Sequence, residues 1–157
     1  MTYSVGFLMD QIAGHVTNYH NMRSVAQSVP ELEATWYEIV YKKPNGSIEQ
    51  MHRLLPFVPT YLTGVLRGAI EMRRALRDCQ SEVLFTNASV RVFFSRALGK
   101  VPTMIDLDAT PAQIDRMAAY SSGWQDPRAL AYLKWRLYQQ TLRAATLVQA
   151  WSRWAKR

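Results

Sequence analysis

The sequence lacks the glycine-rich loops that mark the commonest phosphate-binding enzymes. Only Gly6 and Gly14, eight positions apart, lie in the first expected strand–loop–helix unit, so the G-x-G-x-x-G pattern of dinucleotide-binding domains is absent. There is also no Walker-type loop and no G-x-S-x-G elbow. These absences argue against NAD enzymes, P-loop nucleotide hydrolases and α/β-hydrolases.

Cysteine and histidine are scarce as well. Cys79 is the only cysteine, which excludes an internal disulfide and favours a reducing, cytoplasmic location. The three histidines, His15, His20 and His52, show no Cys/His spacing typical of a zinc site, so we expect no bound metal. No apolar run is long enough to span a bilayer, and no basic residue precedes the first apolar run as in a signal peptide.

Acidic residues are missing from the last thirty positions. The chain has 157 residues and a net charge of +7, and residues 128–157 hold seven Lys or Arg and no Asp or Glu. The other twelve basic and twelve acidic residues cancel within residues 1–127. Three tryptophans and two tyrosines share the basic segment. A solvated helix face is the plain interpretation, a surface for anionic lipid or a phosphate-bearing ligand is the sharper one, and nucleic acid is the least favoured.

Apolar patterning predicts strands that alternate with helices. Strands are expected over 3–9, 34–41, 82–86 and 103–107, with a strand-like run from Leu147 and, less clearly, a short strand over Ser47–Leu55. Helices are expected over 16–28, 60–79, from Asn87 or Ser89 to Gly99, from Thr110 to Gly123, and over 127–146. This order predicts one α/β domain over 1–157, three-layered and Rossmann-like, with a mainly parallel sheet.

Candidate site residues follow the expected strands. His15 lies at the start of a helix, where free backbone N–H groups favour an anionic or hydroxyl-rich ligand. Asp106 and Asp108 end the strand in TMIDLDATP, and we expect their side chains to face opposite ways rather than act as a pair. Asp108, in the loop itself, is the better candidate, and helix capping shared with Thr110 is the alternative.

Three stretches together resemble a known family: VGFLMDQIAGHVTNYHNMR at 5–23, IDLDATP at 105–111 and KWRLYQQTLRAATLVQAWSRWAKR at 134–157. They resemble bacterial glycosyltransferases of the two-domain GT-B architecture, in the retaining group called glycosyl transferases group 1, or family four. The resemblance covers the whole chain and corresponds to the N-terminal, acceptor-side half of that family. Asp106 departs from the pattern, since an uncharged strand residue is more usual there.

The resemblance implies a domain that binds a sugar or lipid-linked acceptor and faces a C-terminal domain, absent here, that binds a nucleotide-sugar. It implies that Asp108 is the catalytic candidate, and that the acceptor-binding residues are Gly14, His15, Thr17, Thr86, Asn87 and Thr110. No cofactor is expected on this half, and hexosyl transfer by the chain alone is not expected. The end at Arg157, with no closing signal, suggests a fragment or a separately encoded piece.

Two alternatives stay open. The first is a non-catalytic α/β module that binds an anionic membrane surface, at the inner face of the membrane, or a protein partner through Arg128, Arg136 and Arg143. The second is a nucleotide-binding domain of flavodoxin-like type, which the missing glycine-rich loop disfavours. Exposed aromatic residues of the last helix and the C-terminus (Trp135, Tyr138, Trp151, Trp154) also predict self-association.

Overall fold

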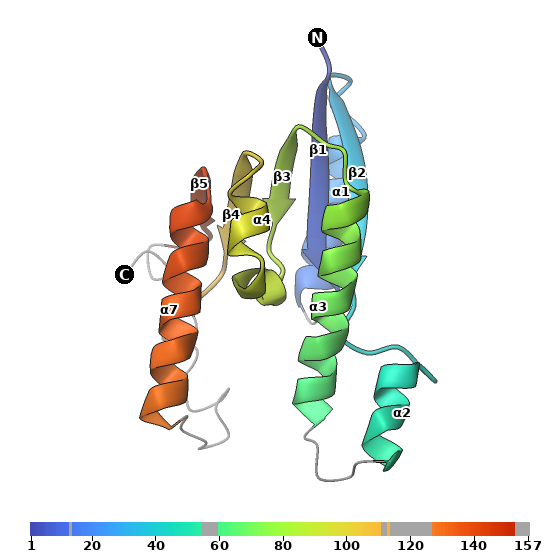
Figure 1. Ribbon diagram of the computed structural model, residues 1–157. Helices are drawn as coiled ribbons and strands as arrows, with labels where there is room; N and C mark the ends of the chain where they lie inside the picture. The colour runs from blue at the N-terminus through green and yellow to red at the C-terminus, as the bar shows by residue number, and fades with distance from the viewer. Residues whose placement is uncertain (13, 55–59, 111–112, 114–126, 153–157) are drawn as a thin grey trace.

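The protein is an α/β domain built on a five-stranded parallel sheet (Figure 1). The computed structural model describes residues 1–12, 14–54, 60–110, 113 and 127–152, and of residues 51–54, 60 and 61 only the backbone. The strands are β1 (Tyr3–Asp10), β2 (Leu32–Ile39), β3 (Val83–Thr86), β4 (Thr103–Leu107) and β5 (Leu147–Ala150). The helices are α1 (Gly14–Ala26), α2 (Ser47–Leu54), α3 (Thr60–Asp78), the 3₁₀ turn η1 (Ser89–Phe93), α4 (Ser95–Leu98) and α7 (Arg128–Ala144).

The strand order is β2-β1-β3-β4-β5. The chain therefore leaves β1 toward one edge of the sheet to form β2 and returns across β1 to form β3. This order is a Rossmann-like, doubly wound arrangement of the kind also found in flavodoxin-like domains. In such sheets ligands bind outside the carboxyl ends of the strands where the order reverses, which here is between β1 and β3.

Helices cover both faces of the sheet, which confirms the predicted three layers. On one face, Leu8 of β1 packs with Met72 of α3 and Leu98 of α4. On the other face, Phe7 and Met9 of β1 pack with residues of α1 and β2. Because successive strand side chains point to opposite faces, the continuous apolar run of β1 serves both cores. Figure 1 shows α3, α4 and α7 on one side of the sheet and α1 on the other.

Most of the predicted strands and long helices are present, with ends that differ by one or two residues. The short strand predicted over Ser47–Leu55 is wrong, because residues 47–54 form the helix α2. Its apolar residues recur at helical spacing rather than in alternation, and the turn before it, with Asn45 at φ 58°, leads directly into a helical hydrogen bond from Gln50 N–H to the Gly46 carbonyl.

The helix predicted from Asn87 or Ser89 to Gly99 is interrupted at Phe94, which separates η1 from α4. Neither Asn87 nor Ser89 caps it, since residue 88 precedes η1 and no side chain caps that turn. Both side chains instead bond to Asp10 at the end of β1. The helix predicted from Thr110 to Gly123 falls largely on residues 111–112 and 114–126, which lie outside the described residues.

Candidate functional site

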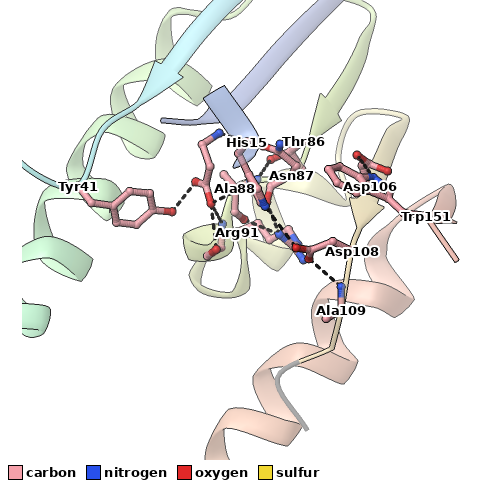
Figure 2. A network of polar contacts seen from close by, with 12 residues as sticks. His15, Tyr41, Thr86, Asn87, Ala88, Arg91, Asp106, Asp108, Ala109 and Trp151 are labelled. Carbon is pink, nitrogen blue, oxygen red and sulfur yellow. Dashed lines mark hydrogen bonds and ion pairs between the residues drawn. The ribbon is translucent and has the colours of Figure 1, made fainter. Parts of the chain in front are cut away.

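Polar side chains gather at the carboxyl ends of β1, β3 and β4. We call this group the carboxyl-edge cluster and define it as Asp10, His15, Asn87, Arg91, Asp106 and Asp108. Asp10 ends β1, and Figure 2 shows the other five side chains, which come from the start of α1, the segment after β3, η1 and the end of β4. The cluster lies where the strand order reverses, the position at which parallel sheets bind ligands.

Asp10 is the buried anchor of the cluster. Its Oδ1 accepts a hydrogen bond from the Tyr41 hydroxyl at 2.5 Å, and its Oδ2 accepts from the N–H and the hydroxyl of Ser89 at 3.0 and 2.9 Å. Its own N–H donates to Asn87 Oδ1 at 2.9 Å. Burial raises the pKa of Asp10 above its ordinary 3.8, and these hydrogen bonds offset the rise only in part. The carboxyl is therefore fixed in place from two segments of the chain, at Tyr41 and at Ser89.

Glycines of α3 allow Tyr41 to reach Asp10. A Cβ on Gly68 would lie 2.6 Å from Cε1 of the Tyr41 ring, closer than side-chain atoms pack, and one on Gly64 would lie 3.4 Å from the Tyr41 carbonyl. Burial and the neighbouring Asp10 carboxylate both raise the pKa of Tyr41, so its hydroxyl stays a donor. The α3 surface thus holds the Tyr41 ring against the end of β1.

His15 stands between two carboxylates. Its Nδ1 lies 3.8 Å from Asp10 Oδ2, and its Nε2 lies 3.5 Å from Asp108 Oδ2. The Asp10 side chain is fully buried, whereas that of Asp108 is half exposed. A protonated imidazole would make ion pairs on both sides. The histidine therefore connects the buried anchor of the cluster with its solvent-facing end.

The prediction that Asp106 and Asp108 face opposite ways rested on strand alternation and is corrected here. Positions two apart along a strand share a face, and Asp108 lies beyond the end of β4. His15 acts electrostatically on Asp106 and lies beside Asp108, and the Asp108 charge itself helps to raise the pKa of Asp106. Asp106 is the buried member of the two, and the indole N–H of Trp151 donates to its Oδ2 at 2.6 Å.

Several buried polar atoms of the cluster have no partner within the described part of the chain. They include Nδ2 of Asn87, Nε of Arg91 and Oδ1 of Asp106, and each of these three side chains is at least nine-tenths buried. Arg91 uses its other nitrogens to donate to the Asn87 and Ala88 carbonyls and to the Tyr138 hydroxyl, but to no carboxylate. Because an unmade buried hydrogen bond costs about 1–3 kcal/mol, such a concentration is typical of a site that awaits a ligand or water.

The structure brings three of the sequence-predicted site residues into the cluster, namely His15, Asn87 and Asp108. Thr86 is buried next to them, and its Oγ1 accepts the Ala88 N–H at 3.1 Å. Thr110 forms a reciprocal capping pair with Gln113, in which the Thr110 N–H donates to Oε1 at 2.8 Å and the Gln113 N–H donates to Thr110 Oγ1 at 3.3 Å.

The remaining predicted residues lie outside the cluster. Gly14 begins α1, and a Cβ on it would meet no atom within 4 Å, so the backbone there is open. Thr17 is exposed on α1. The three basic residues Arg128, Arg136 and Arg143 are all exposed on α7.

Sequence reasoning missed the residues that hold the cluster together. Asp10 had a usable signal, since it ends a buried strand and so shares the sheet edge with Asp106. Tyr41 and Arg91 carry no local signal. Tyr41 lies 31 positions from the aspartate that it contacts, and Arg91 lies 47 positions from Tyr138.

A separate cavity of about 510 Å³ lies along β2 and shares no residue with the cluster. It is lined by side chains of α1, β2 and α3, among them Tyr19, Trp36, Glu38, Glu71 and Arg74. It carries acidic and basic groups that are already engaged with one another or with Tyr19. Among the described residues, no group of three or more His, Cys, Asp or Glu is placed to hold a metal ion.

Comparisons with known proteins add no family to this geometry. A scan against protein-family models and searches of curated proteins and of solved structures found no match. The site must therefore be interpreted from its own residues.

Proposed function

We propose that the carboxyl-edge cluster binds the hydroxyl groups of a sugar, and that the chain is the acceptor-binding half of a retaining glycosyltransferase. The observation that carries the proposal is the mixture of unpaired buried groups: Asn87 and Arg91 offer N–H donors, and Asp106 offers an acceptor oxygen. A sugar hydroxyl both donates and accepts hydrogen bonds, so it can satisfy both kinds at once.

The charges of the cluster favour a hydroxyl-rich ligand over a phosphate. Phosphate oxygens only accept hydrogen bonds, and the cluster holds three carboxylates, those of Asp10, Asp106 and Asp108, against the single guanidinium of Arg91, which acts electrostatically on Asp106. Like charges in such an environment repel. A nucleotide held through its phosphates, as in the flavodoxin-like alternative, therefore fits this edge less well.

Asp108 is the residue to which we assign contact with the reacting hydroxyl. Its side chain is half exposed and lies 3.5 Å from His15 Nε2, so it can accept a hydrogen bond from a ligand that enters from solvent. His15 would hold the carboxylate in position through its place between Asp108 and Asp10. In this proposal the nucleotide-sugar comes from a second domain, and closure of the two domains aligns donor and acceptor.

Saturation-transfer NMR on the 157-residue chain tests the proposal. The probes are single hexoses and N-acetylhexosamines in one arm, and nucleotides and FMN in the other. We expect signals from at least one sugar and a roughly 10- to 100-fold weaker response in the Asp108→Asn variant, because that change removes a charged acceptor. Glu33→Gln, an exposed change on β2, is the control and should bind like the parent chain.

Two outcomes would overturn the proposal. One is binding of nucleotides or FMN without binding of any sugar. The other is sugar binding that Asp108→Asn leaves unchanged, which would place the sugar elsewhere on the chain.

A further inference from the structure

Helix α7 presents side chains that stay exposed in the described part of the fold. Only Thr141 of this helix is buried, and side chains in its first half are strongly exposed: Tyr132 by 60%, Leu133 by 53% and Trp135 by 49%. The second half packs on the body, where Tyr138 accepts a hydrogen bond from Arg91 and the Thr141 hydroxyl donates to the Val92 carbonyl at 3.5 Å. The first half extends beyond the carboxyl ends of β3 and β4 (Figure 1).

The uncovered face combines basic and aromatic side chains. Arg128, Arg136 and Arg143 are spaced eight and seven positions apart, which places them on one side of the helix, and all three are exposed. The rings of Tyr132 and Trp135 lie between them, with centroids 5.8 Å apart. We call these five residues the α7 surface.

No acidic residue balances this charge within the helix. The sequence from 128 to 157 contains no Asp or Glu, although the rest of the chain is neutral overall. A solvated helix face would not need tyrosine and tryptophan between its arginines. Amphipathic rings beside arginines are instead typical of segments that rest at the interface of an anionic bilayer, where the rings enter the headgroup region and the guanidinium groups contact lipid phosphates.

We propose that the α7 surface docks the protein on an anionic lipid bilayer. The association is peripheral, since no described helix is long and apolar enough to cross a membrane. Because α7 begins beyond the carboxyl edge of the sheet, the bilayer would lie at the end of the molecule that holds the carboxyl-edge cluster (Figure 1). The proposal stands on the exposed residues of α7 and does not depend on sugar binding.

Sedimentation with vesicles tests this inference on the full chain. The probes are vesicles of phosphatidylcholine with and without phosphatidylserine. We expect binding only to the anionic vesicles, and a roughly 100-fold loss of partitioning in the double variant Arg136→Glu, Arg143→Glu, because each basic residue near such a surface is worth about fivefold and reversal also adds repulsion. Trp135→Ala should weaken vesicle binding by a factor that stays nearly the same at low and at high salt, because the contribution of the ring is not a charge interaction that salt screens.

A matched control carries the same change in net charge elsewhere. Arg73→Glu with Lys100→Glu alters two exposed residues outside α7 and should bind nearly as well as the parent chain. Equal losses in the two double variants would show attraction by net charge alone and would overturn the α7 surface. So would tighter binding to single-stranded RNA or duplex DNA than to anionic vesicles at the same salt concentration.

Discussion

Replacing Asp106 by asparagine should stabilise the fold at neutral pH and weaken sugar binding. The Asp106 carboxyl is buried, and burial raises its pKa although Trp151, Arg91 and His15 all act to lower it. Its Oδ1 has no partner within the described residues. The ionised form is therefore destabilised in the free protein, as expected for a group placed to meet a ligand rather than to hold the fold.

The size of the expected gain in the free energy of unfolding follows from the contacts of Asp106. Asparagine keeps an oxygen that can accept the Trp151 indole N–H, bonded at 2.6 Å to Oδ2 in the parent chain, and it removes the buried charge. An unsatisfied buried polar group costs about 1–3 kcal/mol, and a neutral amide leaves part of that cost in place, so we expect a gain of about 1 kcal/mol. For a chain of this size the gain corresponds to a rise in Tm of about 2–4 °C.

The pH dependence provides a second readout. The folded pKa of Asp106 lies above the unfolded value of 3.8, so the folded state retains a proton that the unfolded state has already lost. Its contribution to stability is thus fully present below the unfolded pKa and is lost as the pH rises through the folded pKa. The asparagine variant does not lose stability in this way. The difference in the free energy of unfolding between the variant and the parent chain should therefore grow, in favour of the variant, from about pH 4 to about pH 7.

Urea unfolding at these two pH values measures the difference, and sugar titration of the same variant should show weaker binding. Asp108→Asn is the control, because that side chain is half exposed and its removal should leave stability nearly unchanged. A variant of Asp106 that is less stable than the parent chain at neutral pH would show that the carboxylate holds the fold, and would refute the reasoning.

Two further predictions concern the support of Asp10. Gly68→Ala should cost about 1–3 kcal/mol in urea unfolding, because its Cβ would meet the Tyr41 ring at 2.6 Å, whereas Gly64→Ala, with 3.4 Å to a carbonyl, should cost clearly less. Equal costs would contradict the close approach. Tyr41→Phe removes a donor to the Asp10 carboxylate, so the pKa of Asp10 should rise further when followed by NMR titration; an unchanged pKa would exclude that hydrogen bond.

The fold was largely predictable because its signals are local. Buried strands such as 3–10 and 103–107 are short apolar runs bounded by polar loops, and the helical spacing over 60–78 is regular. The prediction for residues 47–54 failed because the segment is short and its helical spacing rests on only three apolar residues, Ile48, Met51 and Leu54. Their pairing with α3, through Glu49 and Arg67 at 2.9 Å, is a tertiary contact that the local pattern does not contain.

The candidate site was predictable only where strand ends mark it. His15, Asn87 and Asp108 follow expected strands, and the geometry of a parallel sheet brings such positions to one edge. The contacts that build the site join distant positions, such as Ser89 to Asp10 across 79 residues. A single sequence does not specify which polar residues will pair over such distances, so Tyr41 and Arg91 emerged only from the structure.

The central claim is that the unpaired donors of the carboxyl-edge cluster bind a sugar, and chemical-shift mapping tests it most directly. The NMR signals to follow are those of the Asn87 Nδ2–H and Arg91 Nε–H groups, which have no partner within the described residues. Addition of a sugar that binds the chain should shift these two signals. The signals of Tyr19, Trp36 and the other residues that line the β2 cavity should not shift. Shifts confined to that cavity, with Asn87 and Arg91 unmoved, would contradict the account.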